Sequence, residues 1–452
     1  MSLPSSTYSG ASKPSITNKQ YMVLALPIIL SQMTTPFLGA VDTAVVGQLP
    51  NPIFIGGVAV GSLIFNTLYW VLGFLRVSTS GFTSQAHGAN NHAELLYSLL
   101  RPMVIALAIG GLFILLQEPI KWTALKMINP TSGVAEQAAL YFDIRIWGAP
   151  FTLMGYVILG WLIGSSCIKL TVYLQIGMNI INILLDVVFV SSFNMGVAGV
   201  AAASLIAEIG VTLAGIYILI KLKLIDIRAI HQIKNIFEGS VFVKMLKVNR
   251  DLFIRSICLL AVYTLFTSKG AQMGDVELAA NAILFQLHFI MAYALGGFGN
   301  ASSILIGRAI GSNNRQLFSD TIALSAKWGV LSAIFLSSIL FICSSFIYPL
   351  FTSIEEVRRC ILQYQGWLLL FPIVGYWGII LNGVFSGATE AAQIRNSMII
   401  SMILFILLVY LLIPIFGNHG LWIAFTLFTL FRSLVLGFYL PALSKNFKTG
   451  VF

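Results

Sequence analysis

The chain has 452 residues, of which 58% are hydrophobic and only 9% are charged. A typical soluble domain carries about 25% charged residues, so the composition excludes a soluble globular protein, a disordered chain and a secreted disulfide scaffold. The net charge of +10 fits basic loops on one side of a membrane better than nucleic-acid binding. We therefore predict an all-α integral membrane protein with many spans.

Twelve apolar segments are long enough to cross the hydrocarbon core, which takes roughly 20 helical residues. They lie at 21–47, 54–86, 93–117, 134–164, 168–192, 195–222, 248–272, 276–306, 315–345, 356–388, 393–415 and 418–442. Residues 1–18 are polar and contain no apolar core, so we expect no cleavable signal peptide. No soluble domain fits between the spans.

Basic residues gather between Lys221 and Arg255, where Asp226, Glu238 and Asp251 are the only acids. The positive-inside rule places this connection in the cytoplasm, and an even number of spans places both termini there too. We expect two six-helix bundles, and the predicted division is a cytoplasmic tail at 1–20, a bundle at 21–222, a cytoplasmic linker at 223–247, a bundle at 248–442 and a cytoplasmic tail at 443–452.

Three acids lie deep in the predicted spans, where a charged side chain costs at least about 2.5–3.5 kcal/mol. They are Asp42 in the first span, Asp186 in the fifth and Glu208 in the sixth, so all three belong to the first half. Pro36 stands six residues before Asp42 and is expected to kink the first span. The alternative is that proline is simply common in membrane helices.

The fifth span carries a polar stripe. Asn179, Asn182 and Asp186 follow one another at intervals of three and four residues, so they share one helix face. Such a stripe either joins neighbouring helices through amide hydrogen bonds or uses its carboxyl group to hold and release a proton or a small cation. We predict ion binding at Asp42 and Asp186, with Glu208 as a supporting residue.

Other polar residues in the spans receive structural interpretations. In the eighth span, His288 is expected to be a neutral hydrogen-bonding residue rather than a titrating one. Arg76, near the end of the second span, is expected to extend toward the interface or pair with an acid. Asp143 and Arg145 are two residues apart, so they point in different directions, and we expect both to be structural.

The two halves of the chain repeat at an offset of about 223 residues. The matching pairs are the turns 88–91 and 311–314, Tyr141 and Tyr364, Gly160 and Gly383, Gly164 and Gly387, and, at offset 224, Gly196 and Gly420. An even number of spans separates the copies, so they have the same orientation and an axis along the membrane normal relates them. Parallel repeats of this kind occur in transporters. Chance similarity between two cytoplasmic turns is the alternative.

The sequence contains no nucleophile–base signature, no HExxH motif and no phosphate-binding loop, so we do not expect an enzyme. The four cysteines are scattered and show no metal-ligand spacing. We therefore expect no cofactor and no certain metal site. With no nucleotide site, transport would be driven by an ion gradient.

Several segments carry a resemblance to a known family. They are "ALPIILSQMTTPFLGAVDTAVVGQLPNP" in span one, "GFLRVSTSGFTSQAHGANN" at the end of span two, "YFDIRIWGAPF" in span four and "GMNIINILLDVVFVSSFNMGVAGVAAAS" over spans five and six. Over essentially its whole length the chain resembles the multidrug and toxic compound extrusion (MATE) transporters, specifically the DinF branch.

The resemblance implies two six-helix bundles arranged in a V around a central cleft, and export of amphipathic, often cationic compounds in exchange for protons or sodium ions. It also implies an ion-coupling site, formed by Asp42, Tyr141, Asn182 and Asp186. Ser204 stands where the family more usually has Thr, and Leu38 stands where relatives carry Tyr.

The resulting prediction is a monomeric multidrug antiporter of the bacterial inner membrane, which exchanges amphipathic drugs for protons and binds no nucleic acid. Sodium coupling stays open, because a carboxylate with amide neighbours can hold either ion. A flippase for lipid-linked precursors is a further alternative, but it would want a basic cavity, and the spans offer few deep Arg or Lys. A passive channel and an intramembrane enzyme are disfavoured, because a polar pore lining and paired catalytic groups are missing from the pattern.

Overall fold

The computed structural model describes residues 16–47, 52–224 and 239–449. Its helices are α1 (Asn18–Val46), α2 (Pro52–Leu72), α3 (Phe74–Gly88), α4 (His92–Leu115), α5 (Gln117–Ile128), α6 (Ser132–Arg145), the 3₁₀ turn η1 (Ile146–Gly148), α7 (Ala149–Gly164), α8 (Ile168–Val187), the π-helical turn η2 (Val188–Ser192), α9 (Gly196–Lys221), α11 (Ser240–Ala271), α12 (Asp275–Gly311), α13 (Arg315–Phe351), α14 (Glu355–Gly387), α15 (Ala391–Phe416) and α16 (Asn418–Thr449).

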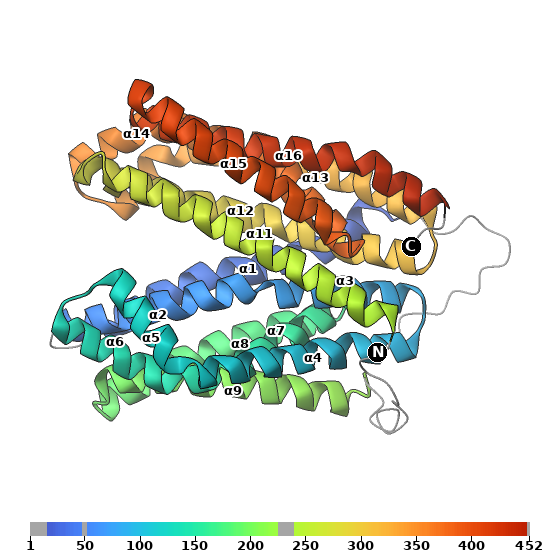
Figure 1. Ribbon diagram of the computed structural model, residues 1–452, viewed down its shortest axis with the longest axis horizontal. Helices are drawn as coiled ribbons and strands as arrows, with labels where there is room; N and C mark the ends of the chain where they lie inside the picture. The colour runs from blue at the N-terminus through green and yellow to red at the C-terminus, as the bar shows by residue number, and fades with distance from the viewer. Residues whose placement is uncertain (1–15, 48–51, 225–238, 450–452) are drawn as a thin grey trace.

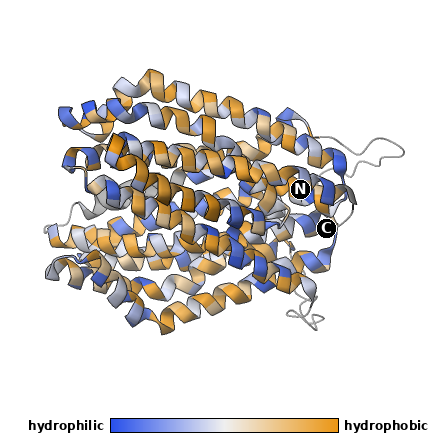
Figure 2. Cartoon of the chain, turned by 45° about the horizontal axis from the view of Figure 1, so that its top comes forward, coloured by the Kyte–Doolittle hydropathy of each residue, from blue (hydrophilic) through white to orange (hydrophobic). Residues whose placement is uncertain are grey.

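These helices form the predicted transmembrane fold. Within the described residues, eleven segments are long and apolar enough to cross a membrane, and α1 adds a further helix of 29 residues. Three of the spans are interrupted helices: α2 continues into α3, α6 into α7 and α8 into η2. Figure 2 shows hydrophobic residues along the middle of the molecule and hydrophilic residues gathered at its two ends, as a bilayer requires.

The short helix α5 was not predicted. It occupies a stretch that the prediction assigned to a connection, and it ends at Asn129, whose left-handed backbone conformation (φ 51°) stops the helix. The ammonium group of Lys121 lies 2.9 Å from Glu118 and 2.7 Å from Asp143. Asp143 therefore ties α5 to α6, as expected for a structural residue.

The same pairs of helices pack together in both halves. The second span packs on the fourth, the fourth on the sixth and the first on the fifth, in α1–α9 and again in α11–α16. Figure 1 shows the two groups as separate bundles, with α1–α9 below and α11–α16 above. The chain thus forms two six-helix bundles related by a pseudo-twofold axis.

Glycine contacts reproduce the repeat residue by residue. Each of four glycines lies against a backbone carbonyl so closely that an added Cβ would come within 3 Å of the oxygen. The pairs are Gly160 with Arg76, Gly383 with Gly299, Gly164 with Ser80, and Gly387 with Ser303. Both members of each pair shift by 223 residues between the halves, so the offset read from the sequence reflects real helix packing.

The predicted pairing of Gly196 with Gly420 is wrong. Gly196 has a φ of +55°, and its counterpart in conformation is Gly417, with a φ of +54°. Thr212 donates to the carbonyl of Phe151 (2.7 Å), as Ser433 does to that of Val374 (2.9 Å), so the offset in the sixth span is 221. The connection before α9 takes two more residues than its counterpart, because it includes the π-helical turn η2.

The two bundles close against each other at the end that carries the 88–91 and 311–314 turns. A Cβ on Gly88 would overlap the backbone of Arg308, and one on Gly311 would overlap the carbonyl of Gln85. The Gln85 amide also donates to the Gly387 carbonyl across the interface (2.9 Å). These contacts link α3 to α12 and α14, so small residues let the halves pack backbone to backbone at this end.

Candidate functional site

A buried ionic network joins α6 to α9 in the first bundle. The Arg145 guanidinium donates through Nη2 to Glu208 Oε1 (2.9 Å) and through Nη1 to the Tyr141 hydroxyl (2.6 Å). Ser62 donates to the same hydroxyl (3.1 Å). The Arg145 and Glu208 side chains are 13% and 8% exposed, so this pair lies in a low-dielectric environment where removing one partner is costly.

Aromatic rings complete the surroundings of Arg145. Its guanidinium carbon lies 5.1 Å from the ring centre of Phe65, 5.6 Å from that of Tyr141 and 5.9 Å from that of Tyr69. Cation–π contacts of this kind help to hold a desolvated charge. Glu208 Oε2 is buried and has no hydrogen-bond partner among the described residues, so one of its oxygens remains available for a proton.

A second polar set lies between α8 and α9. Asn182 Nδ2 donates to Ser204 Oγ (3.4 Å), and Asp186, one helical turn after Asn182, is 1% exposed. Ser204 is in turn one helical turn before Glu208 on α9. The set therefore adjoins the ionic network, and both belong to one polar cluster, made of Tyr141, Arg145, Asn182, Asp186, Ser204 and Glu208 and here named the N-bundle cluster.

The helix that carries Asp186 changes character immediately after it. Residues Val188–Ser192 form a π-helical turn, an irregularity often found at functional sites. A π turn leaves the local backbone with a looser hydrogen-bond pattern than an α-helix. Asp186 thus stands two residues before the point where α8 gives way to the π-helical turn.

The predicted coupling residues whose side chains the structure describes all lie in the first bundle. Tyr141, Asn182 and Asp186 are buried in the first bundle, Asn179 is half-buried on the same helix, and the supporting residues Ser204 and Glu208 join them. Asp42 and Pro36 lie in α1, but their side chains are outside the described residues, so their part in the cluster stays a prediction. Arg145 was interpreted as structural only, although its spacing of four residues from Tyr141 places both on one helix face.

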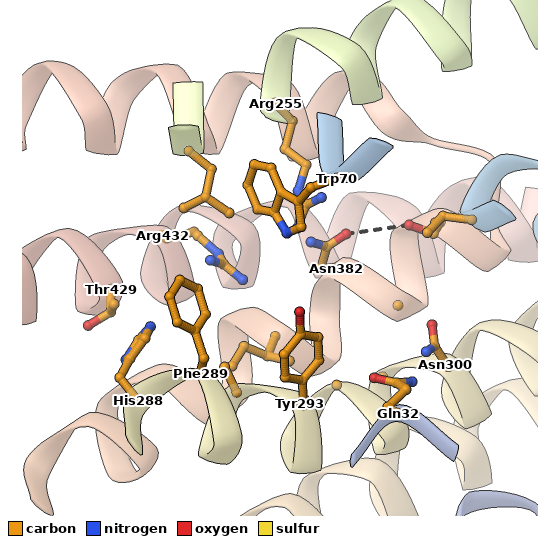
Figure 3. A pocket seen from close by; sticks show the side chains of 18 of the residues that line it. Gln32, Trp70, Arg255, His288, Phe289, Tyr293, Asn300, Asn382, Thr429 and Arg432 are labelled. Carbon is orange, nitrogen blue, oxygen red and sulfur yellow. Dashed lines mark hydrogen bonds between the residues drawn. The ribbon is translucent and has the colours of Figure 1, made fainter. Parts of the chain in front are cut away.

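A central cavity of about 220 Å³ lies between the bundles. Helices of both bundles line it, and three pairs of repeat-related positions face it: Gln32 with Arg255, Trp70 with Tyr293, and Val77 with Asn300. The cavity therefore sits on the pseudo-twofold axis. Figure 3 shows the side chains of Trp70, Phe289 and Tyr293 around this space, which is the apolar, aromatic lining expected of a small-molecule site.

Two arginines give the cavity a positive charge. Arg255 of α11 and Arg432 of α16 both line it, and the described lining contains no Asp or Glu. Figure 3 shows both side chains above Tyr293, with the ring of Trp70 drawn between them. Arg76 lines a small adjoining pocket that shares Gln32 and Asn300 with the cavity. It has no ion pair with a described acid, which leaves the predicted pairing of Arg76 unsupported.

The sequence interpretation missed this positive charge. It counted Arg255 with the basic residues that orient the connection, although the predicted span 248–272 includes it, and it did not single out Arg432, so it did not foresee two arginines in the cavity lining. A usable signal was present, because Arg432 stands alone in the apolar stretch "FTLFRSLVLG". A lone arginine within a span faces protein or water rather than lipid.

His288 lines the cavity at its aromatic side. It is 2% exposed, its ring centre lies 4.0 Å from that of Phe371, and its Nδ1 has no hydrogen-bond partner among the described residues. Packing against aromatic rings therefore helps to position His288, and its predicted role as a neutral hydrogen-bonding residue stays a prediction.

Comparisons with known proteins agree with this architecture. The profile of the MatE family matches residues 27–188 and again residues 252–412, once in each bundle. The chain is 38% identical to DNA damage-inducible protein F of Escherichia coli, over 93% of this chain and 91% of that protein. It is 23% identical to human multidrug and toxin extrusion protein 1, over 92% of this chain and 73% of that protein.

Solved structures show the same fold. A multidrug resistance MATE family transporter of the MOP superfamily, solved in an outward-facing conformation, superposes with a TM-score of 0.86. The match covers 96% of this chain and 97% of that chain at 17% identity.

Proposed function

Because the chain belongs to the MatE family of secondary transporters, we propose that it exports amphipathic compounds in exchange for protons. The central cavity would hold the compound, and the N-bundle cluster would hold the proton. The likeness to a bacterial relative supports placement in the bacterial inner membrane. The basic connection at 223–247 supports cytoplasmic termini, and a cavity and cluster contained in one chain support a monomeric transporter.

The observation that carries this proposal is the pair of buried acids in the first bundle. Asp186 and Glu208 are 1% and 7% exposed, although both stand in spans where an acid is costly. Acids within membrane helices typically mark ion pathways and proton relays. Because these two acids are not part of the cavity lining, they support a separate ion site of the kind that an antiporter needs.

A structural route connects the two sites. Helix α1 packs against α8 in the first bundle and against α12 in the second. Ser31 of α1 donates to Gln175 of α8 (2.9 Å), on the helix that carries Asp186, while the next residue, Gln32, lines the cavity. Protonation of Asp186 would remove a charge between α8 and α9 and thereby change the position of α1 at the cavity.

The energy of a proton gradient is sufficient for such an exchange. One charge that moves through 100 mV gains about 2.3 kcal/mol, and one pH unit adds about 1.4 kcal/mol. The sum corresponds to a concentration ratio of roughly several hundred, since each 1.4 kcal/mol is a factor of ten.

The decisive experiment is transport by the purified protein in liposomes, energised in separate samples by a pH gradient and by a sodium gradient. Export should follow the pH gradient without sodium, and Asp186→Asn should abolish it. Asp320→Asn is the matched control, because Asp320 is a partly exposed acid that accepts a hydrogen bond from Gln316 (2.8 Å), outside both the cavity lining and the N-bundle cluster. If exchange requires sodium and follows its concentration at constant pH, the N-bundle cluster holds sodium and the proton assignment is wrong.

One observation favours a second candidate, the flippase for lipid-linked precursors. Its expected basic cavity, which was missing from the sequence interpretation, is present as Arg255 and Arg432. The exchange experiment separates the two functions, because a flippase moves a lipid phosphate and not a soluble amphiphile.

A further inference from the structure

The charge of the central cavity points to the class of compound that it accepts. We infer that the cavity selects amphipathic anions, whose carboxylate, sulfonate or phosphate group lies between Arg255 and Arg432 while the apolar body packs on the aromatic lining. This inference rests on the proposed function only in taking the cavity as the transport site. It reverses the sign of charge that the family resemblance implies.

The two arginines carry charges that no described acid neutralises. Within the described residues, neither forms an ion pair, and Arg255 Nε is buried without a hydrogen-bond partner. The nearest acid along α11 is Asp251, one turn before Arg255. Its carboxylate is paired with Arg250 (2.9 Å) and Arg395 (2.7 Å), and Asp251 is not among the residues that line the cavity.

Two neighbouring cations inside a membrane protein are expensive. Arg255 and Arg432 line the same cavity, and each loses hydration without gaining a counter-charge from a described acid. An oxyanion removes both penalties at once, because a guanidinium group presents a planar fork of donors that matches a carboxylate or phosphate. The arrangement is therefore suited to a ligand that brings the missing negative charge.

The remaining lining is suited to the rest of an amphiphile. Trp70, Phe289 and Tyr293 offer aromatic faces, and Gln32 and Asn382 offer amide groups between them. Aromatic faces alone would also suit a cation, so the two arginines determine that the preferred ligand carries a negative charge. A volume of about 220 Å³ is below the usual range of roughly 300–1,000 Å³ for drug-sized ligands, which favours compact molecules or the head of a longer one.

The acids of the protein lie elsewhere. Asp186 and Glu208 are in the N-bundle cluster, and Glu208 is already paired with Arg145 (2.9 Å). A cationic compound in the central cavity would meet two like charges and no described carboxylate. The geometry thus separates a site for protons, built on acids, from a site for substrate, built on arginines.

The test is binding by the full-length protein in a neutral detergent, measured by isothermal titration calorimetry. Two probes share one apolar body, naphthalene-1-sulfonate and naphthalen-1-ylmethylammonium. The sulfonate should bind at least about tenfold more tightly, because a hydrogen bond to a charged group is worth roughly a factor of ten or more. Measurable binding of the ammonium probe that is as tight as or tighter than binding of the sulfonate would overturn the inference, whatever the variants do.

Variants locate the selectivity. Arg255→Gln and Arg432→Gln should each weaken sulfonate binding about tenfold or more, and the double variant should lose the preference for the anion. Arg255→Lys should retain part of it. Arg359→Gln is the control, since Arg359 is 78% exposed and should leave binding unchanged. A preference for the anion that survives in the folded double variant would place the anion site elsewhere and overturn the inference.

The source of the anion is distinguished by a third probe, geranyl phosphate. Arginine-dependent binding of the sulfonate supports a soluble organic anion as substrate. Arginine-dependent binding of geranyl phosphate alone supports a lipid phosphate and the same charge selection. The failure of this inference is separable from that of the proposed function: proton-driven export of a cation would sustain the antiporter and refute anion selection. Arginine-dependent anion binding without proton-driven export would support anion selection and refute the proton antiporter.

Discussion

The ion pair of Arg145 and Glu208 allows a quantitative test of the N-bundle cluster. Breaking a buried pair by removing one partner typically costs about 3–5 kcal/mol, because an uncompensated charge remains. The side chains here are 13% and 8% exposed and lie 2.9 Å apart. We therefore expect Arg145→Met and Glu208→Met each to lower the free energy of unfolding by about 3–5 kcal/mol.

The double variant should behave differently from the sum of the single variants. Replacing both members of a buried pair by apolar residues of similar volume is often neutral or stabilising. Arg145→Met in combination with Glu208→Met should therefore restore most of the loss, apart from about 1 kcal/mol for the hydrogen bond that Tyr141 no longer receives. The two single losses sum to about 6–10 kcal/mol and the double variant loses about 1 kcal/mol, so the coupling energy is about 5–9 kcal/mol in magnitude.

The assay is equilibrium unfolding in mixed micelles of increasing dodecyl sulfate content, followed by circular dichroism. Glu355→Gln is the control, because it breaks exposed ion pairs with Arg358 and Arg359 and should cost no more than about 1 kcal/mol. If the loss of unfolding free energy in the double variant equals the sum of the two single losses to within about 0.5 kcal/mol, the two residues do not form a buried pair.

Four further predictions concern the two sites and the interface. Asp42→Asn should abolish gradient-driven export without loss of folded protein, and unchanged efflux in liposomes would remove Asp42 from the coupling site. His288→Gln should keep proton-driven transport, since aromatic packing positions His288; loss of proton coupling would place the ion site in the second bundle. Gly311→Val should lower the thermal unfolding midpoint by forcing α3 from α12, whereas Gly210→Val, in open space, should not, and equal midpoints would contradict the close packing. Arg432→Met should raise the unfolding midpoint of the ligand-free protein, because it removes a desolvated and unpaired charge; a lower midpoint would mean that Arg432 stabilises the fold.

The sequence was sufficient to predict the fold because its long apolar segments are easy to recognise and the bilayer leaves them few possible structures. Backbone polar groups in a bilayer must be satisfied within the chain, so long apolar segments have few alternatives to transmembrane helices. The repeat was detectable for a related reason. Gly160 and Gly383 lie against carbonyl groups where a side chain would not fit, so this close approach of helices requires glycine at both positions.

The N-bundle cluster was only partly predictable. Asn182 and Asp186 could be found because polar residues on one face of an apolar helix need a partner or a function. Arg145 was misjudged because it was compared with Asp143, two residues away, instead of with Tyr141, one turn away. Its pairing with Glu208 on α9 depends on how α6 and α9 pack, and no spacing within a single helix contains that information.

The cavity was the least predictable feature. Arg255 was counted with the basic residues that indicate topology, but the helix continues through this position and directs the side chain to the axis. Which face of a span points to the interior depends on contacts with several other helices, and a single sequence without such contacts cannot assign it. Arginines near span ends are ambiguous for this reason, since they either extend to the interface or line a central site.

The repeat finally explains how one fold can hold both a cluster of buried acids and a cavity lined by arginines. With the offsets of 223 and, in the sixth span, 221, each residue of the N-bundle cluster has a counterpart in the second bundle. The counterparts of Tyr141, Arg145, Asn182, Asp186, Ser204 and Glu208 are Tyr364, Leu368, Phe405, Val409, Phe425 and Thr429. Helix packing is thus preserved while the buried charges are not. The basic residues of the cavity follow the opposite pattern, since Arg255 corresponds to Gln32. Under the proposed mechanism, a proton therefore acts on one bundle and the substrate mainly on the other, and the contacts of α1 with both α8 and α12 couple the two events.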